Sequence, residues 1–255
     1  VYVGAQKFWV EDAGLVTDDE NPYFIIRSLK LYEGPNEHIP SEQRQYFKVF
    51  DHARTRYIFT EFTFENIAHM RRALQNEMNT PFYTRGCNPT VAILRKKIAA
   101  LEKAEDALIF SSGSAAIAAA VMSQVKAGDH IVCVQKPYSW TNKLLNNLLA
   151  RFGVQSAMID GTNPAHYENA IQPNTKVLFL ESPNSLTFEL QDIEAVVKIA
   201  RKHGLTTIID NSYATPIYQT PIERGVDIVT HSASKYLGGH SDIVAGVLCS
   251  NQQIT

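Results

Sequence analysis

The fold of this chain is decided by residues 206–212, Thr-Thr-Ile-Ile-Asp-Asn-Ser, and residues 230–242, Thr-His-Ser-Ala-Ser-Lys-Tyr-Leu-Gly-Gly-His-Ser-Asp. Each stretch continues a short apolar run, typical of a buried strand, into polar side chains. The first delivers the carboxylate of Asp210, and the second delivers the amine of Lys235 among serine hydroxyls. In open α/β sheets, ligands bind beyond the carboxyl ends of the strands. We therefore predict that Asp210 and Lys235 face one ligand site.

An amine and a carboxylate at neighbouring strand ends match the needs of pyridoxal 5'-phosphate (PLP). Lys235 would form the Schiff base, Asp210 would keep the pyridinium nitrogen protonated, and hydroxyls would bind the phosphate. A free lysine titrates near about 10.4, so Lys235 needs a desolvated, PLP-linked position to react. The competing interpretations are a surface lysine at a strand exit and an Asp210 that caps a helix or a turn.

Strand-like and helical segments alternate from residue 103 onward, as they do in β-α-β proteins. Strands are predicted at 107–110, 130–134, 154–159, 176–180, 206–210, 227–231 and 243–249. Helices are predicted at 64–78, 90–104, 115–126, 141–152 and 191–203, and Gly128, Gly153 and Gly204 are expected to end the last three. This order predicts an α/β fold with three layers, α/β/α, around a mainly parallel seven-stranded sheet.

The first part of the chain has a different composition. Residues 1–60 are expected to form an extended N-terminal arm, and residues 61–255 are expected to form the PLP-binding large domain. Residues 11–20 are acidic and predict a loop. The dense aromatic side chains between residues 46 and 64 are expected to pack against a partner subunit.

The segments 210–216, Asp-Asn-Ser-Tyr-Ala-Thr-Pro, and 231–242 closely resemble the Cys/Met-metabolism family of PLP enzymes. That family holds cystathionine synthases and lyases, methionine γ-lyase and homoserine sulfhydrylases, and the similarity runs from about residue 59 to residue 248. The resemblance implies the aspartate-aminotransferase-like fold (fold type I) and a homotetramer built from two active dimers.

The resemblance also implies roles for further residues. The backbone of Gly113 and Ser114, at a predicted helix start, would hold the phosphate, and Ser232 and Ser234 would add hydroxyls. Tyr138 would stack on the PLP ring and assist proton transfers. Without the resemblance, a serine-rich helix start is commonplace and Tyr138 reads as a core aromatic.

Residues 83–90, Tyr-Thr-Arg-Gly-Cys-Asn-Pro-Thr, match a family segment that crosses a dimer interface. The resemblance implies that Tyr83 and Arg85 reach the phosphate in the neighbouring subunit, where an arginine suits phosphate geometry. The alternative is an ordinary loop that leads into the next helix.

Three departures from the family pattern bear on the subclass. Trp140 stands where methionine γ-lyases carry a cysteine, and Ser185-Leu186 stands where the family has Asn-Pro. Either Ser185 or, after a local shift, Asn184 would contact the ring oxygen of the cofactor. Family members continue past residue 255 into a domain that carries the carboxylate-binding arginine, so we expect this chain to be a fragment or to work with another chain.

Net charge and cysteine content limit the classes of partner and the cellular location that we expect. A net charge of -2 gives no reason to expect nucleic acid or an anionic membrane. No apolar run approaches the roughly 20 residues that span a bilayer, and no secretory signal opens the chain. Three widely spaced cysteines, with neither metal-binding spacing nor an even count, predict reduced thiols in a cytoplasmic protein without a metal site.

Together these patterns predict an enzyme of sulfur amino-acid metabolism that catalyses β- or γ-elimination through Lys235, as a carbon–sulfur lyase. Its substrate would be a small amino acid such as cystathionine or methionine. The alternatives are a γ-replacement synthase that resembles cystathionine γ-synthase or O-acylhomoserine sulfhydrylase, and a PLP-binding relic without catalysis. A PLP aminotransferase is a weaker third alternative, because residues 88–90 and 238–242 speak against it.

Overall fold

A computed structural model describes the backbone of residues 2–3, 6–18 and 21–31, and residues 62, 64–77 and 80–251 with their side chains. The chain divides into two compact units, Val1–Ile93 and Leu94–Thr255. Most of the aromatic residues expected to contact a partner subunit lie outside the described residues. The predicted division into 1–60 and 61–255 stays a prediction.

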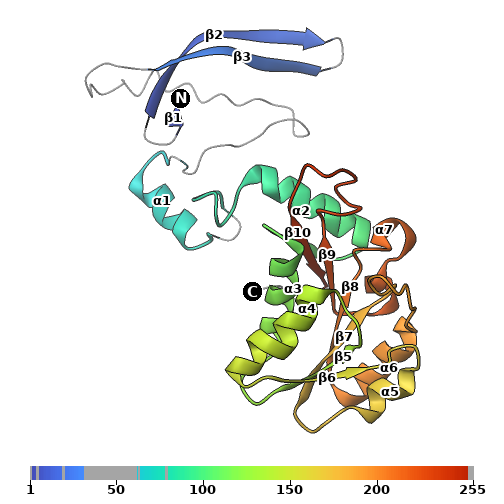
Figure 1. The fold of residues 1–255 in the computed structure, drawn as a ribbon. Coiled ribbons are helices and arrows are strands. Elements are labelled where there is room, and N and C mark those ends of the chain that lie inside the picture. Colours follow the sequence, from blue (N-terminus) through green and yellow to red (C-terminus); the bar gives the residue numbers. More distant parts are fainter. Residues whose placement is uncertain are drawn as a thin grey trace. The chain divides into compact units, whose positions relative to one another are not determined.

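The first unit contains a small antiparallel sheet (Figure 1). Its strands are β1 (Tyr2–Val3), β2 (Gln6–Asp18) and β3 (Asn21–Leu31). The predicted acidic loop at 11–20 is therefore wrong for residues 11–18, which pair with β3 through a register shift between Val10 and Asp12. Acidic composition suggested a loop, whereas ladder pairing with a second strand decides the backbone, and composition does not report that pairing.

Helix α1 (Ile67–Leu74) also lies in the first unit, and helix α2 (Pro89–Glu102) begins there. Asn66 caps α1 by accepting a hydrogen bond from the amide of His69, at 2.8 Å. Asn88 caps α2 in the same way from Thr90, at 2.9 Å, and Pro89 suits the first helical position. Both predicted helices exist: α1 is shorter than predicted at both ends, whereas α2 begins one residue earlier and ends two residues earlier than predicted.

The second unit is built on a seven-stranded sheet in the order β4-β10-β9-β8-β7-β5-β6. The strands are β4 (Asp106–Phe110), β5 (His130–Val134), β6 (Gln155–Ile159), β7 (Thr175–Glu181), β8 (Thr206–Asp210), β9 (Ile228–Ser232) and β10 (Gly246–Ser250). Only β10 runs antiparallel to its neighbours, β4 and β9. The predicted mainly parallel seven-stranded sheet is confirmed.

Helices cover both faces of this sheet (Figure 1). On one face lie α3 (Gly113–Met122) and the irregular helix made of α4 (Ser139–Lys143), a π turn (Leu144–Leu148) and a 3-10 turn (Leu149–Phe152). On the other face lie α5 (Pro164–Asn169) and α6 (Ile193–His203). The predicted three layers are thus present.

Short helices and helix ends account for most of the differences between the predicted and the observed elements. Helix α5, helix α7 (Thr215–Tyr218) and the 3-10 turn Pro221–Arg224 are too short to show an apolar period, so the sequence does not predict them. Gly153 and Gly204 end their helices in the left-handed conformation, as predicted. The third predicted stop was wrong, because α3 ends at Ser123 and Gly128 lies in the loop that follows.

Two buried apolar clusters, one on each face, hold the layers together. Phe179, Ile208 and Ile131 belong to the cluster under α3 and α4, and Leu178, Ile209 and Val229 belong to the cluster under α6. Neighbouring residues of one strand point to opposite faces, so these strands are apolar without alternation. In the part of the chain that the structure describes, no helix is long and apolar enough to cross a membrane.

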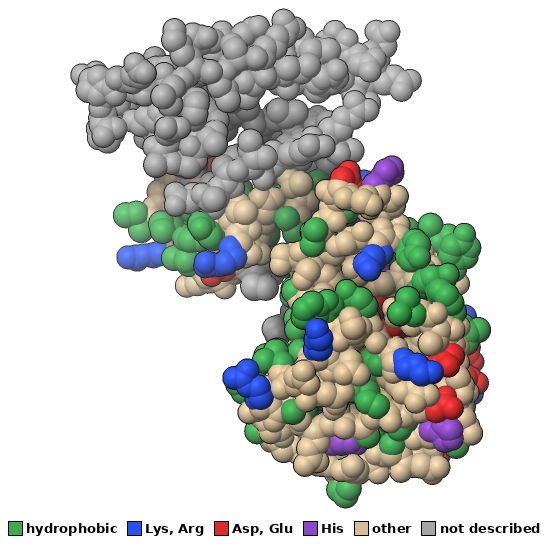
Figure 2. Space-filling model, viewed as in Figure 1, with side chains coloured by type: hydrophobic (Ala, Val, Ile, Leu, Met, Phe, Trp, Pro, Cys, Tyr) green, Lys and Arg blue, Asp and Glu red, His purple; other side chains and the backbone are tan. Residues whose placement is uncertain are grey.

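Surface charge and the state of the thiols can be followed for the described residues. Figure 2 shows the lysine and arginine side chains of this face of the second unit lying apart from one another rather than in one patch. Cys87, Cys133 and Cys249 are free thiols. The cytoplasmic location predicted from them stays a prediction.

Candidate active site

The parallel strands bring most of the predicted site residues to one edge of the sheet. Strands β4, β5, β7, β8 and β9 all run in the same direction, so their carboxyl ends meet there. The loops after these strands carry Gly113 and Ser114, Tyr138, Ser185, and Lys235. Asp210 is itself the last residue of β8. This edge is where an open α/β sheet binds its ligands.

Lys235 lies in the turn that follows β9 and is exposed in this structure. Its Nζ is 5.4 Å from the centroid of the Tyr138 ring. The turn is fixed by two backbone hydrogen bonds, from Lys235 N to Ser232 O and from Gly239 N to Lys235 O, both 3.0 Å long. The amine therefore faces an aromatic ring from a turn of defined geometry.

Asp210 is buried, with 7% of its surface exposed. Its Oδ1 accepts hydrogen bonds from the amide of Ser212, at 2.9 Å, and from the Ser212 hydroxyl, at 2.6 Å. The same hydroxyl accepts a hydrogen bond from the amide of Ser232, at 2.6 Å, and so links Asp210 to the end of β9. Oδ2 of Asp210 has no hydrogen-bond partner among the described residues, and it is not one of their fully buried unpaired atoms. This oxygen is therefore accessible and free to pair with a ligand.

The amino end of α3 abuts the lysine segment. A Cβ added to Gly113 would lie 2.6 Å from the Cβ of Ser232, so these two backbones approach as closely as glycine permits. Ser112 caps the helix by accepting a hydrogen bond from Ala115 N at 3.1 Å. The first amides of a helix have no partner inside it and favour anions. Gly113 and the exposed Ser114 thus present amides beside the hydroxyl of Ser232.

Ser234 has a different environment from Ser232. Its hydroxyl accepts a hydrogen bond from the amide of Ala245, at 3.0 Å, and it also lies 3.3 Å from the Ala245 carbonyl oxygen as a donor. These contacts tie the lysine turn to the segment before β10. Ser234 therefore supports the turn in this structure, and its predicted contact with the phosphate stays a prediction.

Asn184 and Ser185, the two candidates for the contact with the ring oxygen of the cofactor, have different environments in the loop after β7. Asn184 is fully buried, and its side chain accepts from Gln191 Nε2 at 2.8 Å and donates to Lys136 O at 3.4 Å. Ser185 is half-buried, and its amide donates to Glu181. The Asn184 side chain is therefore committed to the scaffold, which favours Ser185 as the residue that faces a ligand.

Tyr83 and Arg85 lie in the first unit, whereas the other predicted site residues lie in the second. The guanidinium carbon of Arg85 is 5.1 Å from the centroid of the Tyr83 ring. Amides of Gly86 and Cys87 both donate to Tyr83 O, so the pair sits on a tight turn before α2. Arg85 is exposed and Tyr83 half-buried.

A second buried carboxylate, Glu181, lies next to Asp210 and is not among the site residues predicted from the sequence. Glu181 ends β7 and pairs in register with Asp210 on β8. Burial and the neighbouring charge of Asp210 raise the pKa of Glu181 to about 7, against the opposing effect of hydrogen bonds from the amides of Tyr138 and Ser185. The signal was present in the sequence, because both apolar strands, 176–181 and 206–210, end in a carboxylate.

The raised pKa predicts a pH-dependent stability. Unfolded Glu181 loses its proton near pH 4.5, whereas the folded protein retains it up to about pH 7. The folded state therefore binds more protons in this window, and its free energy of unfolding falls as the pH rises through it, by up to roughly 3 kcal/mol. Denaturant titrations of the apoprotein at several pH values should show this fall, and Glu181→Gln should show a flatter profile. Parallel profiles would contradict the assignment.

Another buried polar group lies on the opposite face of the sheet. Glu102, at the end of α2, is hydrogen-bonded to His231 and to Asn211, and neither Glu102 nor His231 is exposed. Asn211 and Gln219 extend the network to the carbonyl of Ser182, at 2.9 Å from Gln219 Nε2. These contacts connect α2, β8 and β9 behind Asp210, and thus brace the strand ends that carry the site.

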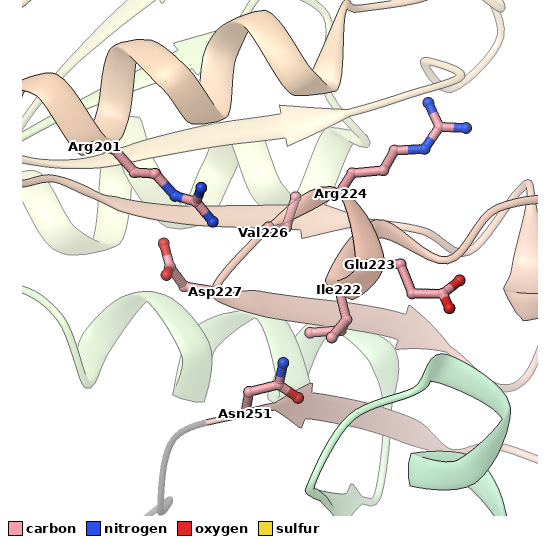
Figure 3. Close-up of a pocket in the computed structure, with 8 residues that line it drawn as sticks. Arg201, Ile222, Glu223, Arg224, Val226, Asp227 and Asn251 are labelled. Atoms are coloured by element: carbon pink, nitrogen blue, oxygen red, sulfur yellow. The ribbon is translucent and has the colours of Figure 1, made fainter.

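A shallow pocket of about 380 Å³ lies at the other edge of the sheet. Figure 3 shows Arg201 directed toward Asp227, while Arg224 and Glu223 point away from it. Asp227 precedes β9, and Asn251 follows β10, so the pocket lies at the ends of these strands that are remote from Lys235. Asp227 is already bonded to Thr207 N and Oγ1, at 2.8 and 2.7 Å. The predicted site is not this pocket.

The arrangement at the carboxyl edge fits PLP in three respects. Asp210 is a buried residue whose Oδ2 is accessible and has no partner among the described residues, which suits a protonated ring nitrogen. Tyr138 offers an aromatic face that Lys235 approaches. Gly113 and Ser114 offer helix amides beside Ser232, which suit a phosphate.

Comparisons with known proteins identify the family of this chain. Residues 38–255 match the model of the family described as Cys/Met metabolism PLP-dependent enzyme. The L-methionine gamma-lyase of Fusobacterium nucleatum is 41% identical over 199 residues, which are 78% of this chain and 50% of that protein. The cystathionine beta-lyase MetC of Staphylococcus haemolyticus is 42% identical over 171 residues, 67% of this chain and 44% of that protein.

A solved structure shows the same fold. The putative O-acetylhomoserine (thiol)-lyase MetY of Campylobacter jejuni, which carries a pyridoxyl-lysine phosphate, superposes with a TM-score of 0.73 and 31% identity, over 77% of this chain and 49% of that one. The chain spans about half the length of the curated relatives that it matches. The family match covers most of the chain and the fold agrees, so this chain belongs to the Cys/Met-metabolism family of PLP-dependent enzymes.

Proposed function

We propose that the protein is a PLP-dependent carbon–sulfur lyase, which eliminates a sulfur leaving group from the β- or γ-carbon of an amino acid such as cystathionine or methionine. The observation that carries the proposal is the placement of Lys235 Nζ 5.4 Å from the Tyr138 ring, at the same sheet edge as the buried Asp210. Relatives at 41% and 42% identity carry lyase names, which support elimination, while a probable cystathionine gamma-synthase at 41% identity keeps replacement as the alternative.

Each residue has a definite task in this reaction. When bound, PLP supplies an electron sink that stabilises negative charge on a substrate carbon. Lys235 would supply the amine that holds the cofactor, and its Nζ would take the proton from the substrate α-carbon. Asp210 would keep the ring nitrogen protonated, and Tyr138 would orient the ring and assist proton transfer. Ser185 would contact the ring oxygen, while Gly113, Ser114, Ser232 and Ser234 would hold the phosphate.

The main competing function is γ-replacement, in which a thiol takes the place of the leaving group. It is favoured by the fold shared with the putative O-acetylhomoserine (thiol)-lyase. A PLP-binding relic is the second alternative, because Ser185-Leu186 departs from the family pattern. Against the relic stands the intact set of Lys235, Asp210 and the α3 amides.

The test is a substrate panel with PLP-loaded full-length protein. L-Cystathionine should give pyruvate and homocysteine if the β-carbon bond breaks, or 2-oxobutyrate and cysteine if the γ-carbon bond breaks, with ammonia in both cases. A synthase would instead consume O-acylhomoserine and a thiol without forming a keto acid. If no sulfur amino acid or acyl-homoserine is turned over, the enzyme proposal fails and the relic remains.

The resemblance supports a site shared between two subunits, in a homodimer-based homotetramer. We expect Arg85→Ala and Lys235→Ala each to be inactive alone, because one lacks a phosphate ligand and the other lacks the amine. Mixed subunits should regain roughly a quarter of wild-type activity, since half of the dimers then hold one complete site. Subunits that stay inactive after mixing and reassembly would show that Arg85 serves its own subunit or no site.

A further inference from the structure

The strand ends of β7 and β8 place two carboxylates side by side, and only one of them has a task so far. Glu181 is 4% exposed and Asp210 is 7% exposed. Because they pair in register on parallel strands, both side chains leave the same face of the sheet. A buried acid beside another buried acid costs free energy, so its contacts should reveal what it contributes.

Both oxygens of Glu181 accept hydrogen bonds from backbone amides of the site. Oε2 accepts from Tyr138 N at 2.7 Å, and Oε1 accepts from Ser185 N at 2.6 Å. Tyr138 follows β5 and Ser185 follows β7, so a single carboxyl group joins two different loops. Tyr138 is also the N-cap residue of α4, and its own side chain makes no capping bond. Glu181 thus bonds the N-cap amide from another strand, a task that a residue within the helix often performs.

We propose that Glu181 is a positioning residue that clamps the Tyr138 and Ser185 loops and so sets the aromatic ring of Tyr138 relative to Asp210 and Lys235. The proposal rests on the proposed function, because Tyr138 and Ser185 matter through the cofactor that they would face. The side chain of Gln191 reinforces the clamp, since it accepts a hydrogen bond from Glu181 N at 3.0 Å and donates one to Glu181 O at 2.8 Å. The backbone of Glu181 is therefore anchored by Gln191, while its side chain holds the two loops.

Charge makes the clamp dependent on pH. The groups that face Glu181 are Asp210 from β8, the thiol of Cys133 from β5, whose pKa burial and Glu181 raise, and the two amides. An ionised carboxylate accepts from both amides, whereas a protonated one has a hydroxyl that no longer accepts as well. The clamp should therefore tighten as the pH rises through about 7, the value at which Glu181 titrates. Asp210 paired with a ring nitrogen would raise the pKa of Glu181 less, so cofactor binding should favour the clamped state.

Amide hydrogen exchange of the apoprotein tests the clamp directly. In Glu181→Gln, at least one of the Tyr138 and Ser185 amides should exchange about tenfold faster, because a hydrogen bond to a charged acceptor is lost. In Glu181→Asp, which keeps the charge but is one methylene shorter, one amide should also lose protection. The matched control is Glu189→Gln, in the same loop, whose side chain pairs only with Lys136 and Thr187 at 3.6 and 3.3 Å. It should leave both amides protected.

Two further readouts separate positioning from general support. In the wild type, protection of both amides, corrected for intrinsic exchange, should increase through pH 7, and in Glu181→Gln it should not. The circular dichroism band of bound PLP should change in Glu181→Gln, and kcat should fall more than KM rises. Unchanged amide exchange in a folded Glu181→Gln, or the same change in the Glu189 control, would overturn the proposal. If no compound of the substrate panel is turned over, the proposed function is contradicted, but the exchange test of the Glu181 clamp still applies.

Discussion

Lys235→Ala is expected to abolish both the covalent attachment of the cofactor and turnover. Lys235 Nζ lies 5.4 Å from the centroid of the Tyr138 ring, in the turn that follows β9. Loss of the amine removes the group that binds the aldehyde carbon and the base for the α-proton, and the second role alone is worth about 10²–10⁴-fold in rate. Activity should therefore fall by at least this factor.

The measurement is borohydride reduction followed by mass spectrometry of peptides. Wild-type protein should carry a pyridoxyl group on the peptide that contains Lys235, and the variant should carry none. Lys143→Ala is the matched control, since this amine lies over the Trp140 ring at 4.4 Å, on the next helix. Label on another lysine in the wild type would reject Lys235 as the attachment point.

Gly246→Ala is expected to produce the largest loss of stability. A Cβ at this position would lie 2.0 Å from the carbonyl oxygen of Ser112 and 2.8 Å from the amide of Gly113. Both are backbone atoms, so the clash can be relieved only by moving β10 or the start of α3. Overpacking in a tight interior costs about 1–3 kcal/mol, and more where backbone must shift.

The same clash should loosen the proposed phosphate site, because it displaces the α3 amides. Denaturant unfolding and PLP affinity should therefore fall together in Gly246→Ala. Gly86→Ala is the control, since its Cβ would meet neighbours at an ordinary 3.6 Å. A Gly246→Ala protein of wild-type stability would mean that α3 and β10 are packed less tightly than described.

The parallel sheet and the carboxyl-edge position of Lys235 could be predicted from the sequence. Their signals are local, because runs such as 206–210 are apolar on both faces and then end in a carboxylate. Glu181 was overlooked for a specific reason. Its importance comes from lying beside Asp210, and strand order, which sets that neighbour, is not written in either strand alone.

Contacts across distant segments were equally hidden. Asn184 looked like a candidate for the cofactor until its amide proved to be bonded to Gln191. Glu102 and His231, which lie far apart in the chain, form a buried pair that no local pattern indicates. In β2, ladder pairing overrode an acidic composition typical of a loop.

Strand β10 has a consequence for how this unit assembles on the ribosome. It is the last strand of the sheet to be synthesised, yet it fills the gap between β9 and β4, the first strand. Until it emerges, no strand joins β4 to β9, the strand that precedes the lysine turn. Contacts between such remote segments form late, because loop closure must precede them. A nascent chain should thus gain affinity for PLP abruptly, once Ser250 has left the exit tunnel, rather than strand by strand.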